Sequence, residues 1–345
     1  MSQKACALNT SPEIFYIDHI APLASLLNIP LIVTDEKNAR LTERYYPEVG
    51  LRYMPDLSDR LKDVVEEFDA LIGCDYWAPH QKQLFSSLYQ KEMRLVFCPH
   101  GQSDKGYETP TLAPYGYQEE VLVYGNLMKK MLCELNLWDR IPSSRAVGNF
   151  RHRYYQKYRD RMQLDAEREI FSLLSPANQT LLYAPTWKDG DRATTFFDCI
   201  EKLVHETPSN WNVIVKIHPL LPARDPTLFY RLSILEEKRS NIAFVHEFPL
   251  IYPLLEKMDA YLGDYSSIGY DALAFQKPMF FLTQPHMRPG RLHACGKILD
   301  ISNHLFDQIE EGMSNSEMLR SRQEELYKNA FAENANLLEA SLGMV

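Results

Sequence analysis

Short apolar runs rich in β-branched and aromatic residues alternate with longer stretches of helical periodicity along most of the chain. The runs are typical of buried strands, and the stretches between them, with apolar residues three and four positions apart, are typical of helices. In the first half, strands are predicted at Ile14–Ile17, Leu31–Val33, Ala70–Ile72, Arg94–Cys98 and Val121–Tyr124, and a helix at Leu127–Leu135. Strands that alternate with helices in this way predict an α/β fold with parallel sheets.

A second set of strands and helices follows residue 150. The segment Arg151–Arg161 interrupts the pattern, because it is rich in Arg and Tyr and poor in aliphatic residues. Beyond it, strands are predicted at Leu181–Ala184, Asn212–Ile217, Ile242–Val245, Ala260–Gly263 and Met279–Leu282, and helices at Phe196–Glu206, Tyr252–Met258 and Asn315–Leu342. Two successive sets of βα units predict two facing Rossmann-like domains, residues 1–150 and residues 151–345, the second ending in a helix.

Length, charge and cysteine content narrow the class of protein. The 345 residues fit two domains, and the net charge of −9 provides no basic field for nucleic acid. The sequence has neither an apolar run near the ~20 residues of a membrane-spanning helix nor a signal-peptide core at its start. The six cysteines never stand in a CxxC spacing, so neither a disulfide framework nor a zinc site is expected. We therefore expect a cytoplasmic protein that binds no nucleic acid.

Ligands of Rossmann-like folds bind at the carboxyl ends of the strands, so the residues that follow each strand carry the chemistry. The run Arg94–Cys98 leads into His100 and Gly101, and Lys105 follows in the loop. A glycine lets the backbone turn or approach a ligand closely, and a histidine titrates near neutral pH, as a general base must. The alternative is a loop histidine that caps a turn.

Two strand ends in the second half carry cations. Thr186 and Lys188 follow the strand Leu181–Ala184, where a turn with a surface lysine is the alternative. Lys216 and His218 alternate on one face of the next strand. Such a pair suits a polyanionic ligand and is costly to bury in a core without one. The competing explanation is that this strand lies at an exposed edge of the sheet, where the pair would not be buried.

The strand Ala260–Gly263 runs into Asp264, and Ser266 and Ser267 then open a predicted helix. Either serine is a natural N-cap, which is the structural explanation. The same geometry would direct backbone N–H groups and hydroxyls at an anion, with support from the helix dipole. Since the sequence has neither a GxGxxG motif nor a P-loop, this serine pair is the stronger phosphate-site candidate.

The order and character of these motifs resemble the CDP-glycerol glycerophosphotransferase family, the teichoic-acid primases and polymerases. The matching stretches are His100-Gly101 with Lys105, Tyr183–Asp189, Lys216–Pro219, and Asp264–Asp271 with Lys277-Pro278. In addition, Gly148–Arg151 resembles the family's Gly-x-Pro-Arg element, and Phe248–Leu255 resembles the segment before its Asp-Tyr-Ser-Ser motif. The resemblance covers about residues 90–285.

This resemblance implies a GT-B-like arrangement, with the acceptor mainly in the N-terminal domain and the CDP-activated donor in the C-terminal one. It implies that His100 removes the proton of an acceptor hydroxyl, which attacks the glycerol-bearing phosphorus of CDP-glycerol or a related CDP-alditol while CMP leaves. The implied catalytic residues are His100 and His218; the implied donor-side residues are Lys216, Ser266, Ser267, Asp264, Thr186, Lys188 and Arg151, with Gly101 and Lys105 on the acceptor or phosphate side. Neither a metal nor a cofactor is required.

The implied acceptor is a lipid-linked or glycan hydroxyl, and the implied product is an envelope or capsule polymer. The segment Arg151–Arg161 interleaves five cations with tyrosines. Such a segment fits peripheral contact with the anionic inner face of the cell membrane, and it equally fits a solvated helix whose arginines form ion pairs. The spacing Asp189-Gly-Asp191 leaves a metal site as a further alternative.

Other functions remain open. A GT-B glycosyltransferase that uses a nucleotide sugar would bind pyrophosphate through the same lysine, histidine and serines. A nucleotide-sugar 2-epimerase shares the architecture but requires carboxylates for proton abstraction, and the candidates here are mostly basic. Outside the enzymes, the chain could be a nucleotide-binding subunit of an envelope-synthesis complex.

Overall fold

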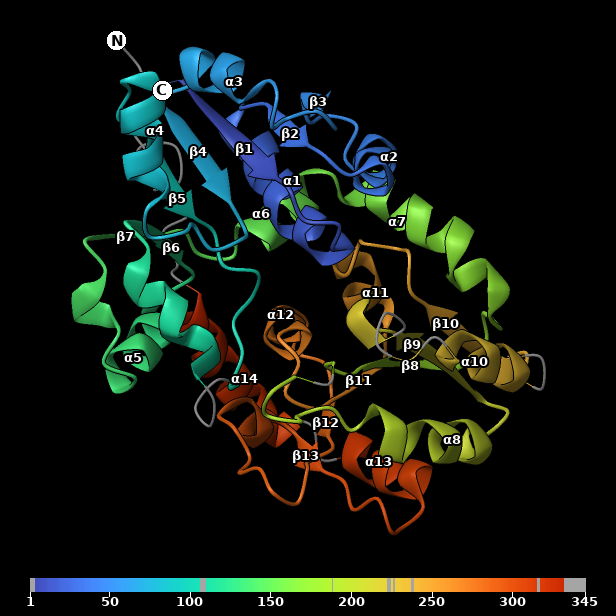
Figure 1. The fold of residues 1–345 in the computed structure, drawn as a ribbon. Coiled ribbons are helices and arrows are strands. Elements are labelled where there is room, and N and C mark those ends of the chain that lie inside the picture. Colours follow the sequence, from blue (N-terminus) through green and yellow to red (C-terminus); the bar gives the residue numbers. More distant parts are fainter. Residues whose placement is uncertain are drawn as a thin grey trace. The chain divides into compact units, whose positions relative to one another are not determined.

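The computed structural model describes residues 4–105, 110–187, 189–221, 225, 227–236, 239–314 and 317–331. These residues form two compact units (Figure 1). The first unit comprises residues 4–102, 110–157 and 329–331, and the second comprises residues 103–105 and the described part of 158–328. The short segment 103–105 therefore belongs to a different unit from the residues that precede it.

The first unit is built on a seven-stranded parallel sheet in the order β3-β2-β1-β4-β5-β6-β7. Its strands are β1 (Ala5–Asn9), β2 (Leu31–Val33), β3 (Leu51–Tyr53), β4 (Ala70–Gly73), β5 (Arg94–Phe97), β6 (Glu120–Val123) and β7 (Ser143–Ala146). The strand order reverses between β1 and β4, as in a Rossmann fold. The carboxyl ends of these two strands mark the ligand edge of the unit.

Helices cover both faces of this sheet, which explains why the inner strands read as continuous apolar runs. The helices are α1 (Ile17–Leu27), α2 (Glu36–Tyr45), α3 (Leu61–Glu67), α4 (Gln81–Tyr89), α5 (Asn126–Glu134) and α6 (Phe150–Lys157), with 3-10 turns at Ile14–Tyr16, Pro110–Tyr117 and Trp138–Arg140. Val65 of α3, Phe68 directly after α3 and Phe85 of α4 pack against one sheet face. Helix α1 packs on β1 and β2 and contacts α2 and α6.

The second unit repeats the plan with a six-stranded parallel sheet in the order β10-β9-β8-β11-β12-β13. Its strands are β8 (Gln179–Ala184), β9 (Trp211–Lys216), β10 (Ile242–Val245), β11 (Ala260–Gly263), β12 (Met279–Phe281) and β13 (Lys297–Ile298). Here the order reverses between β8 and β11. The two predicted Rossmann-like folds are confirmed.

The second sheet is also covered by helices on both faces. The helices are α7 (Arg159–Glu169), α8 (Phe196–Glu206), α10 (Leu228–Glu236), α11 (Tyr252–Lys257), α12 (Ile268–Ala272), α13 (Leu305–Ser314) and α14 (Glu317–Ala330), with 3-10 turns at Phe171–Leu173, Leu273–Phe275 and Leu292–Cys295. Helices α8, α10 and α13 pack on one face, and α8 and α13 lie side by side (Figure 1). None of the helices in the described ranges is long and apolar enough to cross a membrane.

The prediction of a strand at Ile14–Ile17 is wrong, because this segment is a 3-10 turn that leads into α1. Ile14 and Ile17 are buried three residues apart while Phe15 and Tyr16 are partly exposed, which is helical spacing. A short apolar run does not by itself distinguish a strand from a buried helical turn. The central strand β1 was not predicted, since its small residues lack the usual β-branched signal.

An ion triad joins three neighbouring strands. The Glu120 side chain is 7% exposed and accepts hydrogen bonds from Arg94 Nε at 2.7 Å and from Arg145 Nε at 2.6 Å. Burial opposes the charge on Glu120, but the two arginines outweigh it and hold the pKa of this carboxyl below its usual range. The triad therefore couples β5, β6 and β7 through charge as well as backbone pairing.

We expect Glu120→Gln to lower the free energy of unfolding by about 2–3 kcal/mol at pH 7, because it leaves two guanidinium groups without their carboxylate. A carboxyl whose pKa is lower in the folded protein than in the unfolded chain stabilises the fold at pH values above its unfolded pKa. The difference in unfolding free energy between Glu120→Gln and wild type should therefore shrink as the pH falls below about 4.5. Urea denaturation at several pH values measures it. Glu36→Gln, which removes an exposed i,i+4 pair with Arg40, is the control and should change stability by less than about 0.5 kcal/mol. An equal loss in both variants would contradict the prediction.

Candidate active site

The point where strand order reverses in the second sheet holds two predicted site residues. β8 and β11 pair directly, with Ala184 opposite Gly263. Thr186 follows β8 and Asp264 follows β11, so their side chains emerge at the same edge of the sheet. This is the position at which open α/β sheets bind their ligands.

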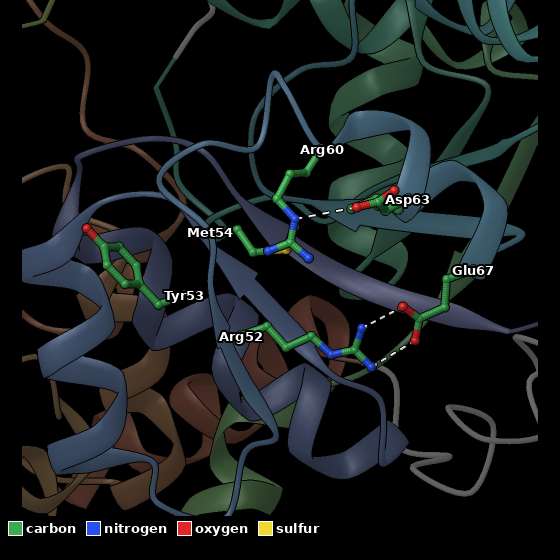
Figure 2. Close-up of a pocket in the computed structure, with 7 residues that line it drawn as sticks. Arg52, Tyr53, Met54, Arg60, Asp63 and Glu67 are labelled. Carbon is green, nitrogen blue, oxygen red and sulfur yellow. Dashed lines mark hydrogen bonds and ion pairs between the residues drawn. The ribbon is translucent and has the colours of Figure 1, made fainter.

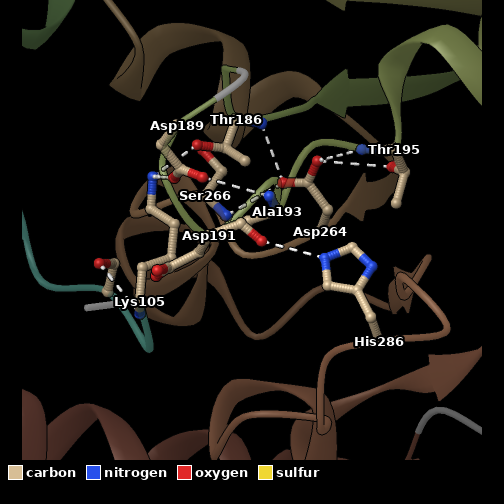
Figure 3. Close-up of polar contacts among 10 residues, drawn as sticks. Lys105, Thr186, Asp189, Asp191, Ala193, Thr195, Asp264, Ser266 and His286 are labelled. Carbon is tan, nitrogen blue, oxygen red and sulfur yellow. Dashed lines mark hydrogen bonds and ion pairs between the residues drawn. The ribbon is translucent and has the colours of Figure 1, made fainter. Parts of the chain in front are cut away.

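Asp264 fixes the backbone around this edge (Figure 3). It is fully buried, and its Oδ1 accepts the N–H groups of Thr186 at 2.9 Å and Ser266 at 3.1 Å. Its Oδ2 accepts from Thr195, from the N–H at 3.1 Å and from the hydroxyl at 3.4 Å. Burial raises the pKa of Asp264 to about 6, against the opposing effect of the backbone N–H groups. A carboxylate that is occupied in this way orders three loop segments.

Lys105 brings a positive charge to the same edge. Its Nζ lies 2.7 Å from Thr186 Oγ1 and 3.0 Å from Asp189 Oδ2 (Figure 3). Asp189 also accepts the backbone N–H of Ala193 at 3.2 Å. The ammonium group is therefore held beside the loop that follows β8.

Lys216 and His218 end the neighbouring strand. β9 lies between β10 and β8, so the alternative of an exposed edge strand is wrong. Lys216 is the last residue of β9 and is only 8% exposed, while Val215 and Ile217 on the other face belong to the core. His218 lies 6.1 Å from the Trp187 ring, between centroids, and its Nδ1 accepts the N–H of Leu220 at 3.2 Å. A neutral His218 therefore carries its proton on Nε2.

The capping explanation does not hold for Ser267. Ser267 occupies the N-cap position of α12, but its side chain makes no capping hydrogen bond. α12 has only five residues, so the expected helix-dipole contribution to anion binding has little basis. Ser266 is buried, and its N–H is used by Asp264.

His100 and Gly101 follow β5 in the first unit. Gly101 has φ 121°, a conformation that favours glycine, as expected for a turn at this point. His100 is exposed, and its ring centroid lies 5.4 Å from Phe15, 5.1 Å from Tyr16 and 6.5 Å from His19. These three rings come from the turn and helix that follow β1.

His19 supports this loop. The Tyr124 hydroxyl donates to the Pro99 carbonyl oxygen at 2.8 Å, so its oxygen accepts a hydrogen bond from the His19 Nδ1–H at 3.1 Å. Burial, the charge of Arg151 and the nearby His100 lower the pKa of His19 well below its usual value. A neutral His19 therefore fixes the residue that precedes His100.

Further side chains at this edge come from other strand ends. Asp75 follows β4, is half-buried and shares a hydrogen bond with the Tyr16 hydroxyl, and burial raises the pKa of its carboxyl. Arg151 lies in the first unit, where its guanidinium is buried in an ion pair with Asp18 and donates to the Asp18 carbonyl oxygen at 2.9 Å. Lys188 lies outside the described residues.

Ion pairs occupy other arginines of the basic segment. Arg159 Nη2 lies 2.8 Å from Glu256, and Arg161 Nη1 lies 3.5 Å from Asp165. Tyr154 and Tyr155 are buried. These contacts match the ion-pair alternative for this segment.

No metal centre is evident in the described residues. No group of three or more His, Cys, Asp or Glu side chains in the described ranges could hold a metal ion, and Asp189 is engaged by Lys105 and Ala193. A pocket of 220 Å³ lies at edge strand β3 (Figure 2). Its arginines are paired, Arg52 with Glu67 and Arg60 with Asp63, so it has no net positive charge for a phosphate.

Comparisons with known proteins cover both the sequence and the fold. The sequence profile of the CDP-Glycerol:Poly(glycerophosphate) glycerophosphotransferase family matches residues 156–331. The chain is 24% identical over 162 residues to the teichoic acid ribitol-phosphate polymerase of Staphylococcus aureus, and 29% identical over 126 residues to the teichoic acid glycerol-phosphate primase of Bacillus spizizenii. The matches cover 43% and 36% of this chain, but only 28% of each relative.

Solved structures match nearly the whole chain. The wall teichoic acid polymerase TagF superposes with a TM-score of 0.65 at 13% identity, over 99% of this chain and 87% of that one. The UDP-GlcNAc 2-epimerase of Neisseria meningitidis superposes with a TM-score of 0.62 at 13% identity, over 99% and 98%. These likenesses establish the expected GT-B-like fold.

The raised pKa of Asp264 predicts a distinctive pH dependence. Because the folded state binds this proton more tightly than the unfolded chain, the stability that Asp264 contributes is present below its unfolded pKa and is lost as the pH rises through about 6. The stability advantage of wild type over Asp264→Asn should therefore fall by about 2–3 kcal/mol between pH 4 and pH 7. Urea denaturation of both proteins across this range measures it, and a constant or growing difference would refute it.

Proposed function

Since the chain belongs to the CDP-glycerol:poly(glycerophosphate) glycerophosphotransferase family, we propose that it moves glycerol phosphate, or a related alditol phosphate, from a CDP-activated donor to a hydroxyl acceptor. The reaction releases CMP and extends or primes a cell-envelope polymer. The teichoic-acid enzymes among its relatives support this assignment, and the family match does not favour the glycosyltransferase alternative.

One observation carries the proposal beyond the family match. Cationic and imidazole side chains gather at the carboxyl ends of β8 and β9, next to the point where the strand order reverses. Lys216 ends β9, His218 follows it, and Lys105 is held on Thr186 after β8. In this proposal they bind the pyrophosphate of the donor, since its two phosphates need positive charge and N–H donors at short range. Ser266 and Ser267 contribute hydroxyls from the end of β11.

The reaction is an in-line displacement at phosphorus. His100 accepts the proton of the acceptor hydroxyl, whose oxygen forms a new bond to the glycerol-bearing phosphorus. The bond from that phosphorus to the bridging oxygen breaks, and CMP leaves with the electron pair. Lys216 and the Nε2 proton of His218 offset the negative charge that develops on the phosphates. A general base such as His100 raises the reaction rate by about 10²–10⁴-fold.

The acceptor is proposed to bind the first unit, around His100. Phe15 and Tyr16 flank the His100 ring, and Asp75 shares a hydrogen bond with Tyr16. Aromatic faces and a carboxylate suit a polyhydroxylated acceptor, such as a lipid-linked or glycan hydroxyl. Peripheral membrane contact through the segment Arg151–Arg161 would compete with the ion pairs that Arg159 and Arg161 already form.

Donor binding tests the proposal directly. Calorimetry should detect CDP-glycerol or CDP-ribitol binding with a preference for cytidine over UDP-GlcNAc. His218→Ala should weaken donor binding by about tenfold or more, since it removes a charge-assisted hydrogen bond to phosphate. His205→Ala, at an exposed position at the end of α8, is the matched control and should bind as wild type. A preference for the uridine sugar would replace this proposal with the glycosyltransferase.

Turnover tests the role of His100 separately. His100→Ala should bind the donor as tightly as wild type but release CMP about 10²–10⁴-fold more slowly in the presence of a competent acceptor. His80→Ala, exposed at the start of α4, is the control. A His100→Ala variant with unchanged CMP release would remove His100 from the mechanism.

A further inference from the structure

The segment that follows His100 is seated in the second unit by Asp104. Its side chain is only 4% exposed, and its Oδ1 accepts the Tyr270 hydroxyl at 2.8 Å. Its Oδ2 accepts the backbone N–H of Leu292 at 3.0 Å, and Arg291 Nη1 lies 3.6 Å from Oδ1. A carboxylate is costly to bury without such partners, and here it has two hydrogen-bond donors and a cation.

The turn that receives Asp104 is shaped for it. A Cβ atom at Gly290 would lie 2.4 Å from Asp104 Oδ2 and 2.5 Å from its Cβ, so a larger residue would collide with the carboxylate. Gly290 is not among the described glycines with a positive φ, so space and not conformation requires it. His293 Nδ1 accepts the Gly290 N–H at 3.0 Å, and the His293 ring packs against Tyr265 and Phe281. These contacts hold the turn without involving Asp104.

The residue after this anchor is Lys105, whose Nζ contacts Thr186 and Asp189. Adjacent Cα atoms are about 3.8 Å apart, so fixing Asp104 also fixes the origin of the Lys105 side chain. Placing a lysine ammonium requires ordering both the backbone and the flexible side chain, and an anchored backbone removes the first of these two costs.

We propose that Asp104, seated against Gly290, Leu292 and Tyr270, is a positioning residue that holds the Lys105 ammonium at the donor-phosphate site. The inference rests on the proposed function for the identity of the ligand, but the seat itself is independent of it. Asp104 touches neither Thr186 nor the donor in this scheme, and it acts only through Lys105.

A double-mutant cycle tests this path. Asp104→Ala and Lys105→Ala should each weaken CDP-glycerol binding by about tenfold, and the double variant should bind no more weakly than Lys105→Ala alone. Gly290→Ala, which fills the seat and leaves the carboxylate in place, should match Asp104→Ala. If the effects of Asp104→Ala and Lys105→Ala multiply, Asp104 does not act through Lys105 and the proposal fails.

Glu206→Ala is the matched structural control. Glu206 is also a largely buried carboxylate of the second unit that accepts a backbone N–H, from Leu305 at 2.7 Å, and pairs with a cation, Lys202. The Glu206→Ala variant should have a lower free energy of unfolding, as Asp104→Ala should, but it should keep wild-type affinity for CDP-glycerol. An equal loss of affinity in this control would mean that general destabilisation explains the effect.

Hydrogen exchange separates this inference from the proposed function. The amides of residues 103–105 should exchange at least tenfold faster in Asp104→Ala and Gly290→Ala than in wild type, with no donor present. If wild type fails to bind CDP-glycerol but the amides of residues 103–105 exchange faster in both variants, the proposed donor is wrong and the anchoring role of Asp104 stands. If exchange is unchanged in both variants, Asp104 does not anchor the segment and the inference is overturned.

Discussion

The buried carboxylate of Asp264 is the interaction on which the rest of the second unit's ligand edge depends. It accepts hydrogen bonds from the Thr186, Thr195 and Ser266 segments. An isolated charge in this position would cost several kcal/mol. The four hydrogen bonds offset part of that cost, and they fix three loops at once. Because Thr186 is fixed, the Lys105 ammonium bound to its hydroxyl is also fixed.

Three aspartates at this edge have different physical tasks. Asp264 orders the backbone, Asp189 pairs with Lys105, and Asp104 seats the segment that carries Lys105. None of the three is arranged as a proton acceptor for a substrate, since hydrogen bonds or ion pairs already occupy its oxygens. This arrangement is consistent with the proposed phosphoryl transfer by positioning and charge, in which the proposed base is His100.

The family match and the geometry support different parts of the assignment. The matched range, residues 156–331, spans nearly all of the second unit and includes Lys216, His218 and Asp264. His100 and Lys105 precede that range, so their proposed roles rest on their motif and their surroundings. In the first unit the surroundings are a neutral buried His19, which fixes Pro99 through Tyr124, and the aromatic rings beside His100.

The sequence by itself determined the elements whose signal is local. Short apolar runs located β2, β10 and β11 with their observed bounds, the alternation around Lys216 identified its core-facing neighbours, and Gly101 marked a turn that requires a positive φ. Only the tertiary structure decided that β9 is an inner strand, that Ser267 makes no cap, and that Asp104 is an anchor. The physical reason is distance along the chain: Asp264 binds Thr195 across 69 residues and Asp104 binds Leu292 across 188, and no local periodicity encodes such partners. Strand order brings them together, and burial then makes each hydrogen bond necessary.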